Sequence, residues 1–357
     1  MKATYIKFLI TSAAVLMFTA CDDNNEGGSA VNTTLNSDII NDFSNNLPVV
    51  VYGELFTKTS SLYDRVGALN DGATDTELTA ARTTWKEARK AWEHSEAFLF
   101  GPVSTKSIDP RIDTWPVNFT DLDAQLASTN AFSADYIDGL DDALKGFHPI
   151  EYLIFGKDGN KAAADLTPRQ KEYLTALALN LKTLTEDLKS FWDKSVTTSY
   201  YHDFTNAGAG STVYETQKSA FEEMVNAMMG ICDEVGNGKI MEPYEAKDPE
   251  LEESPFSQNS FVDFKNNITG VQDVYLGKYT TDGKGLEDLV KAYNLQLDNE
   301  IKAKLSAAIN SFDAFTVPFG QAITTESVKI QNTIDACNAL HNTLEQSLLP
   351  FVQQHSK

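Results

Sequence analysis

Apolar residues recur at steps of three and four along most of this chain, which is the spacing of amphipathic helices. The clearest run predicts one long helix over residues 75–100, opened by Thr74 and ended by Gly101-Pro102. Its apolar positions are Leu78, Ala81, Trp85, Ala88, Trp92 and Phe98.

The same periodicity predicts further helices, and clean alternation of apolar and polar residues is hard to find anywhere. We therefore expect an all-α fold. The other predicted helices are 37–66 with a break near Pro48, 135–155, 167–192, 216–235, 286–307 and 326–353.

Two irregular stretches divide the helical pattern. The glycine-containing segment 200–211 is the expected seam between two helical bundles in tandem, an N-terminal one over 37–205 and a C-terminal one over 206–357. Residues 241–258 carry three prolines and are expected to form a long connector. Helices with aromatic ends occur in both halves and suggest an internal duplication.

The first residues have the order of a targeting segment. Lys2 and Lys7 precede a short apolar run, and a small residue then precedes Cys21. This resembles a bacterial lipoprotein signal, so we expect a signal peptide over 1–20, lipidation of Cys21 and a flexible polar tether over 21–36. An ordinary signal peptide with a chance cysteine is the alternative. The lipoprotein interpretation predicts an outer-membrane anchor, facing the periplasm or the cell surface.

The chain is acidic, with a formal net charge of −22. Residues 1–20 contain two lysines and no acid, so the mature chain would carry −24. Such a chain is repelled by nucleic-acid phosphates. The acid excess serves solubility or draws cations toward a pocket. Cys232 and Cys337 either form one disulfide or remain buried thiols, and they do not have the spacing of a thiolate metal site.

His148 and Glu151 lie three residues apart in an apolar run, so a helix would present them on one face. A carboxylate buried there needs a partner, and a metal ion, a basic side chain or a backbone amide would serve. Pro149 is expected at the first helical position, with His148 near the N-cap. Glu151 would then be a capping-box residue that reaches a backbone N–H, which is the structural alternative.

A second group of polar residues follows the stripe Trp85, Arg89, Trp92 and Glu96, which should face a core or a cleft. The alternative is an internal ion pair between Arg89 and Glu96. His94 lies on the other side of this helix and is expected to be solvated.

Residues 107–116 combine two prolines with two aspartates and are expected to form a loop. Loops carry function readily, and Asp113 and Trp115 are its unusual residues. The alternative is a hydrophobic plug under a loop.

Taken in chain order, these three motifs resemble the imelysin-like family, whose hallmark is G-x-H-x-x-E, here Gly146, His148 and Glu151. Segments 264–271 and 285–290 are also similar to that family. The resemblance spans residues 37–352. It implies an all-helical fold of two bundle-like halves, with the hallmark near their junction, in a secreted or lipid-anchored protein.

Some members of this family were described as peptidases, and related iron-uptake proteins look like metal binders that use the same His and Glu. Carried over by position, the resemblance makes His148 and Glu151 the first candidate ligands. We expect Glu96 and Asp113 to supply additional carboxylates. The implied pocket residues are Arg89, Ser95, Arg111, Trp115 and Tyr152. An imidazole with carboxylates suits iron and zinc ions alike, with iron favoured by the resemblance.

The expected function is therefore a lipid-anchored extracytoplasmic protein that captures iron, or an iron-containing ligand, for metal uptake, with an outer-membrane transporter as a partner. Two alternatives remain open. One is a metallopeptidase with Glu151 as general base, although a third protein ligand is not recognisable. The other is a module that binds a small ligand or a glycan at the cell surface without metal.

Overall fold

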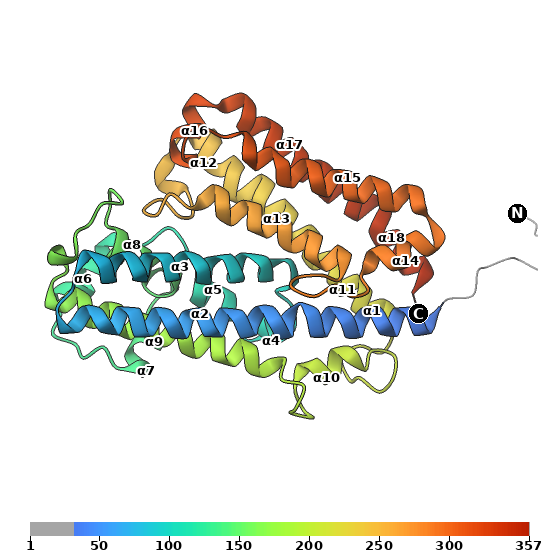
Figure 1. Cartoon of the computed structure of the whole chain (residues 1–357), viewed down its shortest axis with the longest axis horizontal. Helices are drawn as coiled ribbons and strands as arrows, with labels where there is room; N and C mark the ends of the chain where they lie inside the picture. The colour runs from blue at the N-terminus through green and yellow to red at the C-terminus, as the bar shows by residue number, and fades with distance from the viewer. Residues whose placement is uncertain (1–31, 357) are drawn as a thin grey trace, which may run out of the picture. The chain divides into compact units, whose positions relative to one another are not determined.

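The structure is a computed structural model that describes residues 32–356, and within these residues it contains helices and no strand (Figure 1). The predicted all-α fold is confirmed. The predicted signal peptide and Cys21 lie outside the described residues. The first helix, α1 (Thr33–Asn46), begins earlier than the predicted start of the body at residue 37.

The N-terminal half is built on long antiparallel helices. The predicted break at Pro48 is confirmed, since α1 ends at Asn46 and α2 (Pro48–Ala68) begins at the proline. Helix α2 packs between α3 (Asp75–Ser95) and α9 (Pro168–Phe191). Figure 1 shows these helices lying side by side along the longest direction of the view.

The C-terminal half adds a second set of helices. Helix α13 (Ser260–Leu276) packs directly on α3 and joins the two halves. It also contacts α11 (Gln217–Asp233) and α15 (Leu295–Ser311), and α15 packs on α17 (Ser327–Thr343). The two halves therefore meet along α3 and α13, and α11 also packs against α1.

Shorter elements connect these helices. The remaining α-helices are α4 (Pro102–Thr105), α5 (Ile108–Asp113), α6 (Phe119–Ala127), α7 (Ala134–Asp138), α8 (Phe147–Phe155), α10 (Tyr200–Thr205), α12 (Met241–Ala246), α14 (Leu286–Tyr293), α16 (Phe319–Thr325) and α18 (Leu349–His355). Short 3₁₀ turns are η1 (Leu69–Asp71), η2 (Glu96–Phe98), η3 (Asp142–Leu144), η4 (Ala163–Asp165), η6 (Pro249–Leu251) and η7 (Phe312–Ala314), and π-helical turns are η5 (Glu234–Ile240) and η8 (Leu344–Leu348).

The predicted starts of α3 and α9 are confirmed by their caps. Thr74 Oγ1 accepts from the Glu77 N–H at 3.3 Å, and Glu77 Oε2 accepts from the Thr74 N–H at 2.8 Å. Thr167 and Gln170 form the same reciprocal box before Pro168. These pairs satisfy backbone donors that a helix leaves unpaired at its first turn.

Two predicted helices are interrupted. The range 135–155 contains α7, η3 and α8. Gly146 adopts φ +81° and is the N-cap from which α8 begins. A Cβ at Gly146 would lie 2.2 Å from the Ile112 carbonyl oxygen, so only glycine permits this close approach. The range 286–307 is divided at Asn294, whose side chain accepts from the Leu297 N–H and begins α15.

The predicted end of a helix at Gly236-Asn237-Gly238 is wrong. The chain continues through these residues as the π-helical turn η5 and leads into α12, inside the predicted connector 241–258. Side chains of Cys337 and Asn338 on α17 pack against Gly236. The low helix propensity of glycine predicts a helix end here, but the helical turn continues where it packs against α17.

His94 is buried rather than solvated, because α13 covers that side of α3. Its Nδ1 lies 2.7 Å from Asp273 Oδ2, and its exposed fraction is 5%. The close approach depends on Gly270, where a Cβ would lie only 2.4 Å from the His94 carbonyl oxygen. The expectation failed because the periodicity of α3 does not reveal that a second helix covers its other side.

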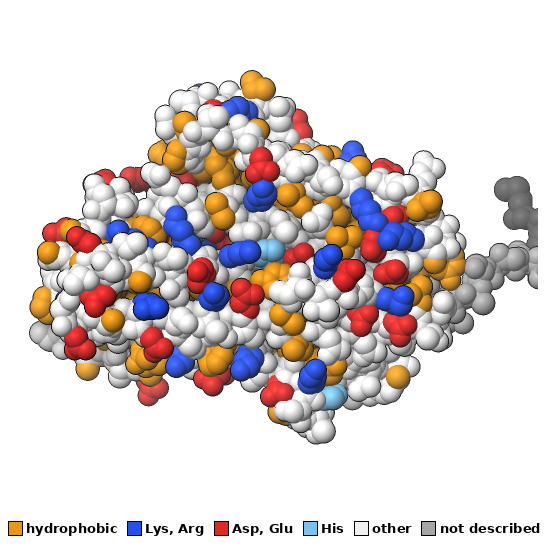
Figure 2. Space-filling view, viewed as in Figure 1, with side chains coloured by type: hydrophobic (Ala, Val, Ile, Leu, Met, Phe, Trp, Pro, Cys, Tyr) orange, Lys and Arg blue, Asp and Glu red, His pale blue; other side chains and the backbone are white. Residues whose placement is uncertain are grey.

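Three further observations bear on the sequence-based expectations. Cys232 and Cys337 are both buried free thiols. None of the helices within residues 32–356 combines the length and apolar character needed to cross a membrane. Figure 2 shows Asp and Glu side chains interspersed with Lys and Arg over the face that it draws.

We predict that Gly270→Ala lowers the free energy of unfolding by about 1–3 kcal/mol, because the added methyl group overpacks the contact between α3 and α13. Gly230→Ala on α11 is the matched control. A Cβ there meets nothing within 4 Å, and we expect a gain of about 0.5–1 kcal/mol. Chemical denaturation measures both changes, and equal effects of the two substitutions would contradict the packing argument.

Candidate metal centre

A cluster of charged side chains lies in the interior between the two halves. Seven segments supply it: α3, η2, α5, α8, η5, the loop before α13, and α13 itself. Every member is at most 6% exposed. We call it the buried charge cluster, and its members are Arg89, Glu93, Glu96, Asp113, His148, Glu151, Lys239, Glu253 and Asp263.

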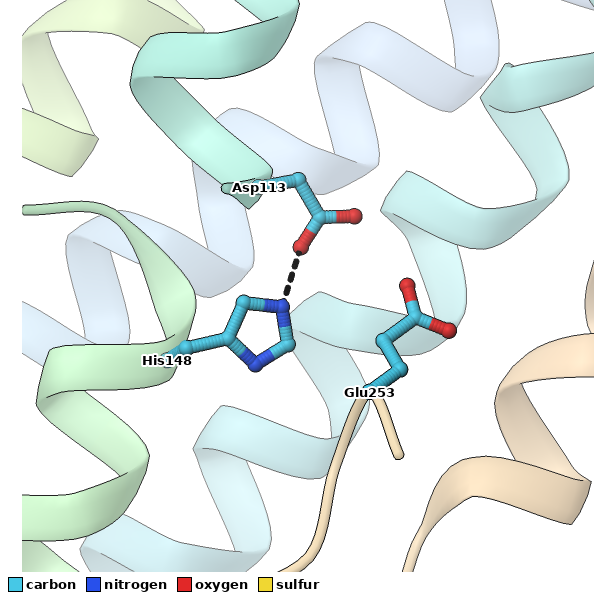
Figure 3. Close-up of side chains that lie close together, drawn as sticks. All are labelled: Asp113, His148 and Glu253. Atoms are coloured by element: carbon cyan, nitrogen blue, oxygen red, sulfur yellow. Dashed lines mark ion pairs between the residues drawn. The ribbon is translucent and has the colours of Figure 1, made fainter. Parts of the chain in front are cut away.

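His148 lies in the first turn of α8, where it faces a carboxylate on each side. Its Nε2 is 2.9 Å from Asp113 Oδ1, and its Nδ1 is 3.5 Å from Glu151 Oε2. Neither contact has the alignment of a hydrogen bond, so both ring nitrogens are buried without a hydrogen-bond partner among the described residues. Figure 3 shows the imidazole directed toward Asp113, with the Glu253 carboxylate beside them.

Glu151 does not cap its own helix. Its Oε1 accepts from the Ser257 N–H at 2.7 Å, in the loop before α13. Helix α8 begins at Phe147 with Gly146 as its N-cap, so the predicted start at Pro149 and the capping-box interpretation are wrong. Glycine at the restart lets the helix begin earlier, and a proline still fits within the first helical turn.

Asp113 ends α5, so part of the predicted loop 107–116 is helical. Its Oδ2 accepts from Trp92 Nε1 at 2.6 Å, and its Oδ1 pairs with Arg89. The Trp115 ring lies 6.1 Å from the His148 ring, measured between centroids. Asp113 therefore contacts both Arg89 of the α3 stripe and His148, so the structure brings residues of the three motifs together.

Arg89 pairs with carboxylates from four segments and not with Glu96. Its guanidinium contacts Glu93 on its own helix and Asp113 on α5, and lies 2.9 Å from Glu253 Oε1. Asp263 Oδ2 is 3.8 Å away. The alternative of an internal Arg89–Glu96 ion pair is wrong, because the C-terminal half supplies a different partner to each side chain.

Lys239 is the partner of Glu96 and was not foreseen from the sequence. The π-helical turn η5 places its Nζ 2.9 Å from both Glu96 Oε2 and Glu253 Oε1. Glu93 Oε2 lies 3.9 Å away and Glu234 Oε1 3.7 Å away. Turns of this type are frequent at functional sites, but their position is not visible in helical periodicity.

Glu253 was also missed. It lies between η6 and α13, in the stretch that the sequence marks only as a proline-containing connector. Its Oε1 accepts from Arg89 and Lys239, whereas its Oε2 has no hydrogen-bond partner among the described residues. No spacing signal links Glu253 to the motifs of the N-terminal half.

Two overlapping groups within the described residues have the geometry to coordinate a metal ion. One is Asp113, His148 and Glu253, and in each group one candidate ligand atom per residue lies within 4.8 Å of the others. The other group is Glu93, Glu96, Asp113 and Glu253. Of the predicted ligands, the structure brings His148, Asp113 and Glu96 into these groups. Glu151 belongs to neither and contacts the imidazole from the opposite edge.

The predicted pocket residues have separate places. Arg89 and Trp115 lie in or against the buried charge cluster. Ser95 is buried and donates to the Trp92 carbonyl at 2.6 Å. Tyr152 packs on aromatic rings beside the cluster. Arg111 is not brought to the cluster, since its half-buried guanidinium pairs with Asp138.

A cavity of about 170 Å³ reaches two members of the cluster, His148 and Glu253. Its lining is largely aromatic and proline-rich, with several carboxylates. The other lining residues are Trp115, Pro116, Val117, Phe119, Lys157, Pro249, Glu250, Glu252, Pro255 and Phe256.

Burial and pairing shift the pKa values of the cluster in opposite directions. Burial alone lowers the pKa of His148, but the carboxylates of Asp113 and Glu151 outweigh it and raise this pKa to about 9. Burial raises the pKa of Asp113, yet Arg89 and His148 reverse the effect and place it well below its usual value. Burial raises the pKa of Glu96 well above the ordinary value, although Lys239 opposes it.

We predict that the stabilising contribution of His148 in the metal-free protein depends on pH. Because its pKa rises from 6.5 to about 9 on folding, the contribution is complete below pH 6.5 and is lost as pH rises through 9. The shift corresponds to about 3 kcal/mol. The difference in unfolding free energy between wild type and His148→Gln should therefore shrink from pH 6 to pH 9.5. A difference that stays constant over this range would contradict the raised pKa.

Comparison with known proteins gives a consistent assignment. The sequence profile of the imelysin family matches residues 49–346. Iron-regulated protein A of Synechococcus elongatus is 29% identical over 320 residues, which cover 88% of this chain and 86% of that protein.

Solved structures share the fold. A crystal structure described as a candidate iron-regulated protein A precursor from Parabacteroides distasonis has a TM-score of 0.81 and 25% identity, covering 90% of this chain and 95% of that one. An imelysin-like protein from Psychrobacter arcticum has a TM-score of 0.72 and covers 90% of this chain and 97% of that one. At 13% identity, this second likeness concerns the fold alone.

Proposed function

Because the chain belongs to the imelysin family, we propose that it binds a metal ion, with iron as the first candidate, through Asp113, His148 and Glu253. The observation that carries this proposal is the convergence of ligand atoms from these three buried residues, which lie within 4.8 Å of one another. Oε2 of Glu253 has no hydrogen-bond partner among the described residues. Leaving such an atom unpaired in an interior is costly, and a cation coordinated there would remove the cost.

The donor set fits a transition-metal ion. One imidazole and two carboxylates are ligands that iron and zinc both accept. The relative from Synechococcus elongatus is named for iron regulation, which favours iron. His148 and Glu253 line the cavity, which would give an ion or a small iron chelate a path from the surface.

Glu151 has a different role in this proposal from that of a ligand. It lies beside Nδ1 of His148, whereas Nε2 faces Asp113. The Ser257 N–H fixes the other oxygen of Glu151. A carboxylate in this position orients a metal-binding imidazole and raises its basicity. The same engagement argues against Glu151 as the general base of a peptidase, so the geometry favours binding over hydrolysis.

Outside the described residues, the proposal includes the lipid anchor at Cys21 and an extracytoplasmic location. A tethered metal-binding body would deliver its ion to a membrane transporter, which is the proposed partner. Support for this part comes from the signal-like order of residues 1–21 and from the acidic tether behind Cys21.

We predict that Glu253→Gln abolishes saturable binding of Zn²⁺ and of anaerobically added Fe²⁺, because it removes the charge of an unpaired ligand oxygen. Glu250→Gln is the matched control, since the same change is made three residues away at the exposed mouth of the cavity and should leave binding intact. Isothermal titration calorimetry and elemental analysis measure both. Undiminished metal uptake by Glu253→Gln would rule out the proposed site.

We predict that Glu151→Gln weakens metal binding by about 10–100-fold without abolishing it, as expected of a residue that orients a ligand. The same variant should lower the pKa of His148 in the metal-free protein, because it removes a carboxylate that raises this pKa. NMR titration of the imidazole measures the second effect. Complete loss of binding with an unchanged imidazole pKa would instead make Glu151 a direct ligand.

A further inference from the structure

Lys239 sits where a metal ion would be expected. Its ammonium group is surrounded by carboxylate oxygens of Glu96 and Glu253 at 2.9 Å, with Glu93 at 3.9 Å. The side chain is fully buried, and its Nζ also lies 5.3 Å from the centroid of the Trp115 ring. Lys239 is therefore close to three of the four carboxylates in the second candidate metal-binding group.

The two groups adjoin each other, since Asp113 and Glu253 belong to both. In addition to these shared carboxylates, the first group contains His148 and the second contains Glu93 and Glu96. Paired cation positions bridged by carboxylates are a recurrent arrangement within helical bundles. Here the position beside His148 holds Glu253 Oε2, which has no hydrogen-bond partner among the described residues, whereas Lys239 lies in the position beside Glu96.

We propose that Lys239 is a built-in cation that fills the second of two adjoining cation positions and thereby limits the protein to a single metal ion. The proposal rests on the proposed function for the first position only. Without the Lys239 ammonium group, a divalent cation would bind there. We call this position the latent site, and its carboxylates are those of Glu93, Glu96, Asp113 and Glu253.

The distances from Nζ of Lys239 to the carboxylate oxygens are those of an ammonium ion and are longer than metal–oxygen bonds. Charge-assisted contacts of 2.9 Å are ordinary for an ammonium group, whereas zinc–oxygen bonds are about 2.0–2.2 Å. The ligand atoms of the four carboxylates already lie within 4.8 Å of one another, so modest side-chain rotation would close them around an ion.

Asn267 on α13 offers an independent indication. Its Nδ2 donates to Glu93 Oε2 at 2.5 Å and to Glu96 Oε2 at 2.7 Å. Its Oδ1 is fully buried and has no hydrogen-bond partner among the described residues. Rotation of the amide would turn this oxygen toward the carboxylates, where it would serve as a further neutral ligand of a metal ion.

The test compares the metal content of purified protein after equilibration with Zn²⁺ and, anaerobically, with Fe²⁺. Removal of the ammonium in Lys239→Ala leaves buried carboxylates without their cation, so we expect this variant to hold one more metal ion per chain than wild type. Lys239→Arg retains the charge and should bind as wild type does. The double variant Lys239→Ala/Glu96→Gln should lose the additional ion.

The outcomes separate this inference from the proposed function. If wild type binds no metal and Lys239→Ala binds one ion, the proposed function fails and the latent site stands. Equal metal content in wild type and Lys239→Ala overturns the inference, as does an additional ion in Lys239→Arg.

Folding of the variant supplies a second readout, because a buried cluster deprived of its cation is destabilised. Added Zn²⁺ should raise the melting temperature of Lys239→Ala more than that of wild type, since the ion binds only the folded latent site. A variant that neither folds nor gains stability with either metal would also overturn the inference.

Discussion

The buried guanidinium of Arg89 is the interaction on which the rest of the site depends. It lies among carboxylates from α3, α5, the loop before α13, and α13, and is completely inaccessible to solvent. Charges buried in this way are tolerated only when they are paired, so the segments that carry Glu93, Asp113, Glu253 and Asp263 must converge on it. That convergence also sets the position of His148, because Asp113 contacts both the guanidinium and the imidazole.

The helical architecture was accessible from the sequence because periodicity, caps and prolines are local signals. Thr74, Thr167 and Pro48 mark helix starts that the structure contains. The failures occurred where tertiary contact overrides local preference. At Gly236, packing against α17 accompanies a π-helical turn where glycines suggested a helix end, and at His94, α13 covers a helix face that looked solvent-exposed.

The candidate site was predictable only in its N-terminal half. His148, Asp113 and Glu96 were found because each stands in a motif whose polar residues are unusual for their surroundings. Lys239 and Glu253 gave no such signal, since one belongs to a glycine-rich turn and the other to a proline-containing connector. Spacing places Glu151 on the His148 face, but it cannot tell a ligand from the orienting carboxylate that we propose.

The path of the chain through the cluster has a consequence for dissecting the protein. A fragment that ends at the predicted seam near residue 205 would keep Arg89, Asp113 and His148 but would lack Glu253 and Asp263, two of the four carboxylates around the guanidinium. The helix that covers His94 would be missing as well. The two halves therefore complete one another, and separate expression of either would divide the structure through its buried charge cluster.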